Sequence, residues 1–181
     1  SLGMPGMHGT VYANYSITEA DLLIAAGVRF DDRVTGNIKE FATKAKKIHI
    51  EIDPAEVNKN VAVDLSIVAD VKQVFGELLN KTTEQKRPDW HEQIKKWKEQ
   101  YPLKNDFSME SLKPQYVISS INEILEEDSS VVADTGQHQM WAAQYIKSTR
   151  ARRFMTSGGL GTMGYSYPAA LGVQVAKPDS L

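Results

Sequence analysis

Short apolar runs that end at glycine or proline recur through the first part of the chain. Residues 21–26 (DLLIAA) stop at Gly27, and residues 65–69 (LSIVA) form a similar run. Such runs are typical of buried strands. Between them, isoleucines alternate with polar residues over positions 48–52, just before Pro54. This alternation predicts a strand with one face less buried than the other.

A helical pattern follows the third of these runs. Its apolar positions are Val71, Val74, Phe75, Leu78 and Leu79. They recur at the spacing of one helical face, and Asp70 stands just before them as a natural N-cap. Strands that alternate with helical stretches predict parallel strand–helix–strand units in a layered α/β domain. We expect the stretch 28–36 to be a loop.

The rest of the chain has a polar middle stretch and then a second α/β pattern. Trp90, Ile94 and Trp97 recur at helical spacing among charged residues, which favours a solvated linker with one docked helix over a binding segment. From Gln115 onward the pattern predicts a helix over 117–125, a strand over 130–133, a helix from 139 to 146, a strand over 153–156, a glycine-rich turn and a helix ending near 176.

Composition and charge exclude several classes of function. The 21 Lys and Arg against 23 Asp and Glu leave a net charge of −2, so nucleic-acid or membrane-surface binding gains no support. The chain has no cysteine and therefore no disulfide or thiolate metal site, which suits a cytosolic protein. No apolar run approaches the roughly 20 residues of a membrane span. We expect both ends to continue into a longer protein, because the chain opens on a glycine-rich loop.

Two segments of the first α/β pattern carry candidate chemistry. Residues 3–9 (GMPGMHG) hold three glycines, which either open backbone amides toward a phosphate or flat ring or simply close a domain edge. Residues 27–36 (GVRFDDRVTG) follow a strand, where α/β sheets bind ligands. Their two arginines and two aspartates form either a surface ion-pair network or a fork for a diphosphate or carboxylate. The position at a strand end favours the second.

Two acidic residues, Glu51 and Asp53, lie at the end of the second predicted strand. Asp53 precedes Pro54, an arrangement typical of an N-cap with proline in the first helical position. An acidic residue at such a strand end commonly accepts hydrogen bonds from ribose hydroxyls. Glu51 is therefore the better ribose candidate.

Two turns of the second α/β pattern suit a diphosphate. Residues 134–139 (DTGQHQ) join a strand to a helix, whose first amides would face a phosphate. His138 is either a donor to that phosphate or a structural residue. Residues 157–164 (SGGLGTMG) place four glycines among eight residues. A glycine inside an element costs about 0.5–1 kcal/mol relative to alanine, which indicates a backbone that touches a ligand. Met163 either supports an aromatic ring or lies in the core.

Taken in order, four segments resemble the acetolactate synthase (acetohydroxyacid synthase) large subunits, a family of thiamine-diphosphate-dependent enzymes. They are residues 6–9 (GMHG), 29–36 (RFDDRVTG), 136–144 (GQHQMWAAQ) and 156–164 (TSGGLGTMG). The resemblance implies an internal fragment with a layered α/β fold and parallel sheets. Its implied parts are the later part of a Rossmann-like, FAD-binding middle domain (1–82), a linker with a docked helix (83–113) and the first part of a C-terminal thiamine-diphosphate-binding domain (114–181).

The resemblance also assigns roles to individual residues. It implies FAD contacts at Gly6, Met7, His8, Gly27, Val28, Arg29, Asp31, Arg33, Val34, Glu51, Ile52 and Asp70. It implies thiamine diphosphate contacts at Thr135, Gly136, Gln137, His138, Gly161, Thr162 and Met163. Arg33 has a second implied role as the catalytic-site residue that grips the carboxylate of the second 2-keto acid.

By resemblance, the whole enzyme decarboxylates pyruvate and condenses it with a second pyruvate or with 2-ketobutyrate, in branched-chain amino acid biosynthesis. The family's catalytic glutamate and its Mg²⁺ ligands fall outside this sequence. We therefore expect the chain alone to be inactive, and no metal ligand is named in it. The family also implies a homodimer or larger assembly with a small regulatory subunit, in the bacterial cytoplasm or in a plastid.

Two alternatives to this interpretation stay open. One is a related thiamine-diphosphate enzyme, such as glyoxylate carboligase or pyruvate oxidase, which would share the glycine turns. The other is a non-catalytic nucleotide-binding module with the same fold. Arg33 and the run 137–144 favour acetolactate synthase over its relatives.

Overall fold

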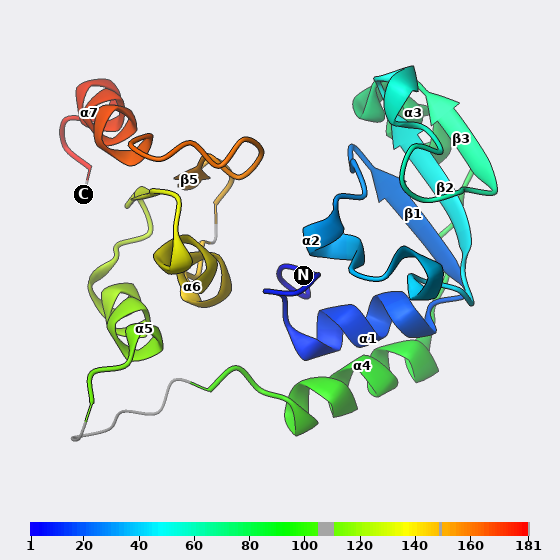
Figure 1. Cartoon of the computed structure of the whole chain (residues 1–181), viewed down its shortest axis with the longest axis horizontal. Coiled ribbons are helices and arrows are strands. Elements are labelled where there is room, and N and C mark those ends of the chain that lie inside the picture. The colour runs from blue at the N-terminus through cyan, green and yellow to red at the C-terminus, as the bar shows by residue number, and fades with distance from the viewer. Residues whose placement is uncertain (105–110, 149, 181) are drawn as a thin grey trace. The chain divides into compact units, whose positions relative to one another are not determined.

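The chain divides into two compact units, Ser1–Pro102 and Leu103–Leu181. The computed structural model describes residues 1–104, 111–148 and 150–180. Each unit contains its own parallel sheet with helices around it (Figure 1). The α/β class predicted from the sequence is therefore confirmed for both units.

The first unit is built on a sheet of three parallel strands in the order β1-β2-β3. The strands are β1 (Leu22–Ala26), β2 (Lys46–Glu51) and β3 (Leu65–Val68). The helices are α1 (Val11–Glu19), the one-turn α2 (Asp32–Thr35), the 3-10 turns η1 (Ile38–Glu40) and η2 (Pro54–Glu56), and α3 (Val71–Leu79). The three predicted strands and the helix after Asp70 are confirmed.

Side-chain caps start the helical segments where the sequence predicts them. The Asp70 carboxylate accepts hydrogen bonds from the amides of Lys72 and Gln73, and that of Asp53 accepts one from the amide of Ala55. Both act as N-caps, as expected. The segment expected to be a loop, 28–36, instead contains α2, because Asp31 caps that turn through the amide of Arg33.

The burial of β2 differs from the sequence expectation. The alternation of isoleucine with polar residues predicted one less buried face, yet His49, Ile50 and Glu51 are all buried. The expectation is wrong at this end because β2 is the central strand and Phe30 covers its other face, with its ring centroid 4.9 Å from that of His49. Phe30 also belongs to the buried cluster with Ala25 and Val61.

The helix predicted around Trp90 and Trp97 is α4 (Pro88–Gln100), and it packs on α1 within the first unit. The ring of Tyr15 on α1 lies 5.6 Å from that of Trp97, and Trp90 contacts Trp97 edge-on at 5.8 Å. Aromatic pairs at such distances stabilise a helix contact. The predicted domain limits themselves, at 82 and 113, stay a prediction.

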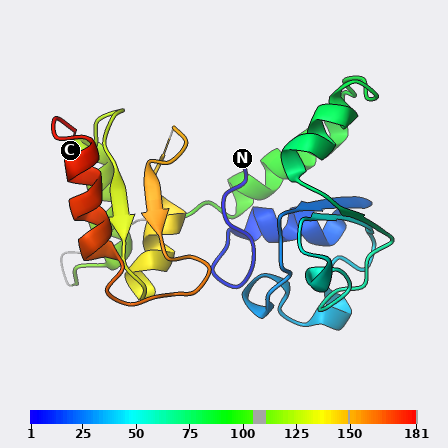
Figure 2. The same cartoon turned by 90° about the horizontal axis from the view of Figure 1, so that it is seen from above.

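The second unit pairs two parallel strands, β4 (Val131–Ala133) and β5 (Phe154–Thr156). Its helices are α5 (Pro114–Ile124), α6 (Gln137–Tyr145) and α7 (Ser166–Ala176). Figure 2 shows the strands side by side, with α7 along β4. The predicted elements are confirmed, although α6 begins two residues earlier than expected. Within the described ranges, no helix combines the length and apolar character needed to cross a bilayer.

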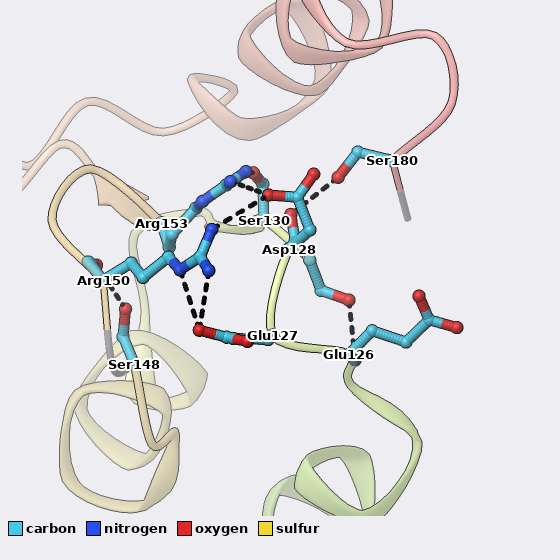
Figure 3. A network of polar contacts seen from close by, with 9 residues as sticks. Glu126, Glu127, Asp128, Ser130, Ser148, Arg150, Arg153 and Ser180 are labelled. Carbon is cyan, nitrogen blue, oxygen red and sulfur yellow. Dashed lines mark hydrogen bonds and ion pairs between the residues drawn. The ribbon is translucent and has the colours of Figure 1, made fainter.

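A network of ion pairs joins the segments at the amino ends of β4 and β5 (Figure 3). Arg150 donates from Nε and Nη2 to Glu127 Oε1, at 3.0 and 2.7 Å. Arg153 contacts Asp128 and donates to Ser130 Oγ at 3.3 Å. These contacts hold the start of β5 beside the start of β4. The turns that carry the candidate site follow the opposite, carboxyl ends of the two strands.

Candidate functional site

The carboxyl edge of the first sheet brings together candidate residues that are far apart in the sequence. The amide of Gly27 donates to Ile50 O at 2.9 Å, and the amide of Ala69 donates to Glu51 O at 3.1 Å. Gly27, Glu51 and Asp70 therefore lie at the ends of neighbouring strands. Ligands of open α/β sheets bind at this edge.

Glu51 is held firmly at that edge. Its Oε1 accepts hydrogen bonds from the amides of Ile52 at 2.8 Å and Asp53 at 3.3 Å. A ribose hydroxyl would therefore have to use Oε2. Ile52 itself is 67% exposed, so its side chain is open to a flat ligand.

The loop after β1 is held by two polar side chains that the sequence interpretation did not identify. His49 Nε2 donates to Val28 O at 2.8 Å; Nε2 carries the proton because a carbonyl only accepts. Asn60 Nδ2 donates to the carbonyls of Arg29 and Phe30 at 3.2 and 3.1 Å. Phe30 has a φ of 50°, which is unfavourable for a bulky residue and needs such support. One sequence signal for His49 was available, since it lies between two isoleucines of a predicted strand.

The two glycine-containing motifs of the first unit meet. The amide of Met7 donates to Arg33 O at 2.9 Å, and a Cβ on Gly6 would lie only 2.3 Å from that same oxygen. Gly6 is thus required by close backbone contact as well as by its φ of 93°. A cavity of about 280 Å³ opens beside Gly6, Met7 and Val34.

The side chain of Arg33 is held loosely. It is 70% exposed, its Nη1 lies 3.8 Å from Asp32 Oδ2, and the same nitrogen lies 3.9 Å from the sulfur of Met7. Asp31, the other neighbouring carboxylate, caps α2. Most of the guanidinium is therefore open to solvent, which suits capture of a small carboxylate or phosphate.

The side chain of Asn14, on α1, binds both the amide and the carbonyl of Gly6. Its Oδ1 accepts from the Gly6 amide at 2.7 Å, and its Nδ2 donates to the Gly6 carbonyl at 2.9 Å. The sequence interpretation gave Asn14 no role, because the contact exists only once α1 folds back on the loop. Asn14 is a positioning residue for the 6–9 segment.

We expect Asn14→Ala to lower the free energy of unfolding of the chain by about 1–3 kcal/mol, because the Gly6 amide loses its partner and the Gly6 carbonyl keeps only its bond from the Gly9 amide. Asn14→Asp keeps only the acceptor, so its free energy of unfolding should lie between those of the wild type and Asn14→Ala. Asn80→Ala, which removes an exposed bond of 3.3 Å to Gly76 O, is the matched control. Urea unfolding measures all four proteins. Equal losses of unfolding free energy in Asn14→Ala and Asn80→Ala would contradict the positioning role of Asn14.

In the second unit, the turn from β4 into α6 is shaped for a ligand. Gly136 is the N-cap of α6 and supplies no side chain to cover the first amides of the helix. Its φ is 155°, and a Cβ there would lie 2.9 Å from the ring of His138. Thr135 Oγ1 is buried and has no hydrogen-bond partner among the residues that the structure describes. Uncapped amides beside an unpaired hydroxyl suit a diphosphate.

The glycine-rich loop between β5 and α7 lies against this turn. A Cβ on Gly161 would be 3.7 Å from Thr135 Cγ2. Ser157 holds the loop by accepting hydrogen bonds from the Gly161 amide at 2.9 Å and, through Oγ, from the Thr162 amide at 3.0 Å. Met163 is 81% exposed, so it is not a core residue here. The two candidate turns therefore form one surface.

Asp134 joins the two turns, and the sequence interpretation gave it no role. Oδ1 accepts from the amides of Thr135 at 2.7 Å and Gly164 at 2.9 Å. Oδ2 accepts from Ser166, from the hydroxyl at 2.7 Å and from the amide at 3.0 Å. The Ser166 hydroxyl, followed by these amides, holds the pKa of the Asp134 carboxyl well below its usual value. The group is therefore an ionised acceptor at neutral pH.

Comparison with known proteins bears directly on both units. A family model described as "Thiamine pyrophosphate enzyme, central domain" matches residues 1–78, and one described as "Thiamine pyrophosphate enzyme, C-terminal TPP binding domain" matches residues 134–181. The chain belongs to the thiamine pyrophosphate enzyme family. The turns around Thr135 and Gly161 thus fall in the family's TPP-binding domain, and the edge with Gly27 and Glu51 falls in its central domain.

Curated relatives narrow the comparison within the thiamine pyrophosphate enzyme family. The chain is 49% identical to "Acetolactate synthase large subunit" of Pyropia yezoensis over 99% of its length, and that match covers 31% of the relative. It is 49% identical to "Acetolactate synthase 2, chloroplastic" of Zea mays over 98% of its length, covering 29% of the relative. "Acetolactate synthase large subunit" of Parasynechococcus marenigrum (strain WH8102) is 46% identical over 99% of the chain. The chain thus spans about a third of the length of these relatives.

Proposed function

We propose that the chain forms much of the FAD site and the start of the thiamine diphosphate site of an acetolactate synthase. The observation that carries the proposal is the match, along nearly the whole chain, to relatives named acetolactate synthase. A related thiamine-diphosphate enzyme and a non-catalytic nucleotide-binding module are both less well supported, because the relatives named above are all acetolactate synthases. The limits 1–82, 83–113 and 114–181 for the FAD part, the linker and the thiamine diphosphate part belong to the same proposal.

The second unit suits the diphosphate of thiamine diphosphate. The unpaired hydroxyl of Thr135 and the open first amides of α6 offer donors, and Gly136 leaves room for them to reach a phosphate. Gln137 and His138 follow on the same exposed turn. Gly161, Thr162 and Met163 lie across from it, where they would support the pyrimidine. When bound, the cofactor supplies the decarboxylation and carbon–carbon bond chemistry, and these residues bind and orient it.

The first unit suits a dinucleotide such as FAD. Gly27 and Glu51 lie at neighbouring strand ends, with Val28, Arg29 and Asp31 in the loop that follows β1. Ile52 and Asp70 belong to the same edge. The loop of Gly6, Met7 and His8 packs on the backbone of Arg33 and Val34. In this proposal FAD takes no net redox part.

Arg33 is the proposed group for the carboxylate of the second 2-keto acid. Its exposed guanidinium makes a long ion pair with Asp32, at 3.8 Å, and a contact of 3.9 Å with the sulfur of Met7. A bidentate contact with a carboxylate would be both shorter and better aligned. The proposed substrates are pyruvate and 2-ketobutyrate, in branched-chain amino acid biosynthesis.

Magnesium, assembly and location complete the proposal. Mg²⁺ would accompany the diphosphate, although no group of three or more His, Cys, Asp or Glu gathers among the described residues to hold it. The words "large subunit" in the relatives' names support an assembly with a smaller regulatory subunit, built on a homodimer or larger core. The name "chloroplastic" supports a plastid, with the bacterial cytoplasm as the other proposed location.

We expect the purified full chain to bind FAD and, separately, thiamine diphosphate with Mg²⁺. FAD binding is followed by quenching of flavin fluorescence, and thiamine diphosphate binding by calorimetry. Gly136→Ala should weaken the second and leave the first, because the φ of 155° disfavours a side chain there and the added Cβ, 2.9 Å from the His138 ring, would push that exposed ring aside. Gly172→Ala, on α7 with nothing within 4 Å of the added Cβ, is the control. A chain that is folded by circular dichroism yet binds neither cofactor at millimolar concentration would refute the proposed binding sites.

A further inference from the structure

The carboxylate of Asp134 is shared between two segments that the sequence separates by about thirty residues. It accepts four hydrogen bonds, one from the turn after β4 and three from the glycine-rich loop and the start of α7. Gly164 has a φ of 87° and belongs to a loop with few side chains of its own for packing. The loop therefore depends on bonds to its backbone. Asp134 binds the Gly164 amide at the end of the loop, and it binds the amide and the hydroxyl of Ser166 at the start of α7.

These bonds act on the residues that face the proposed cofactor. Gly164 directly follows Met163 and Thr162, and Thr135 directly follows Asp134. Thr135 Cγ2 is also the nearest atom to a Cβ built on Gly161, at 3.7 Å. A movement of the loop away from Asp134 would therefore separate the two surfaces on which a diphosphate and a pyrimidine would rest.

We propose that Asp134 is a positioning residue, which fixes the glycine-rich loop and the first turn of α7 against the 135–138 turn before the cofactor binds. The inference rests on the proposed thiamine diphosphate site. Asp134 need not touch the cofactor, since all four of its hydrogen bonds go to the chain itself. Hydrogen bonds to an ionised carboxylate are stronger than those between neutral groups, so the single carboxylate of Asp134 can hold both segments.

Substitutions at both ends of the contact test the proposal. Asp134→Asn removes the charge and turns one acceptor oxygen into a donor amide, which faces the donors of the loop. Ser166→Ala removes only the bond from its hydroxyl, at 2.7 Å, and Ser166→Thr restores a hydroxyl. Glu123→Gln is the matched control for charge, because Glu123 is an exposed carboxylate on α5 of the same unit.

Hydrogen exchange of the full chain measures the loop without any ligand. We expect the amides of Gly164 and Ser166 to exchange about tenfold faster in Asp134→Asn and severalfold faster in Ser166→Ala. Ser166→Thr and Glu123→Gln should match the wild type. Unchanged exchange at both amides in Asp134→Asn would overturn the proposal. If Asp134→Asn does not fold, unchanged exchange in Ser166→Ala would overturn it instead.

Calorimetry with thiamine diphosphate and Mg²⁺ then tests the link to the cofactor. The dissociation constant should rise about tenfold in Asp134→Asn, while FAD binding to the first unit stays the same. Faster exchange with an unchanged dissociation constant would overturn the positioning role. A wild-type chain that binds no thiamine diphosphate would instead contradict the proposed function, and the exchange comparison would still decide whether Asp134 holds the loop.

Discussion

Gly6→Ala is expected to destabilise the first unit by about 3 kcal/mol, through overpacking and backbone strain together. The added Cβ would lie 2.3 Å from Arg33 O and 2.8 Å from Val34 Cα, and both are backbone atoms that cannot rotate away. The φ of 93° at Gly6 adds strain to any residue with a side chain. The loop would have to leave the 31–36 segment, and the proposed FAD site would open.

Gly76→Ala is the matched control, because it makes the same chemical change in the same unit. Gly76 lies inside α3, and a Cβ there meets nothing within 4 Å. Alanine should therefore raise stability by about 0.5–1 kcal/mol, the usual difference inside a helix. The two substitutions are expected to shift the unfolding free energy in opposite directions.

Thermal unfolding followed by circular dichroism measures both variants. A loss of about 3 kcal/mol corresponds to a fall of about 15 °C in the midpoint for a unit of this size. FAD titration of the same samples shows whether the site is lost below the midpoint as well. A Gly6→Ala protein as stable as the wild type would mean that the 6–9 loop does not pack on Arg33 as described.

The features that the sequence predicted depend on neighbours along the chain. Strands were recognised from runs such as 21–26, whose burial follows from their own composition. The caps at Asp53 and Asp70 were recognised because each binds an amide two residues ahead. Close sequence spacing therefore carries this information, and the α/β class follows from the order of such elements.

The residues that the sequence interpretation missed act across the fold. His49 and Asn60 hold carbonyls 21 and 30 residues away, and Asp134 binds an amide 30 residues away. No local pattern specifies such a partner, since it depends on which strands become neighbours. The burial of the polar face of β2 was missed for the same reason: Phe30 covers it only after the loop returns over the sheet.

His49→Ala is expected to lower the free energy of unfolding by about 3 kcal/mol, which combines a cavity with the loss of a buried hydrogen bond. His49 is completely buried, and its Nε2 binds Val28 O at 2.8 Å. Its ring also packs edge-on against Phe30 at 4.9 Å. The loop 28–30 would lose one of its two side-chain supports, and FAD affinity should fall with it. His91→Ala, at an exposed position of α4, should have almost no effect.

His49→Phe separates packing from hydrogen bonding at the same position. Phenylalanine keeps an aromatic ring against Phe30 and removes Nδ1, which is buried and has no partner. It also removes the donor to Val28 O, a part-buried carbonyl, and the loss of that bond costs about 1 kcal/mol. If the bond holds the loop, His49→Phe remains destabilised and binds FAD weakly. Wild-type stability and FAD affinity in His49→Phe would show that packing alone supports the loop, because the side chain at position 49 would then keep its aromatic ring but make no hydrogen bond.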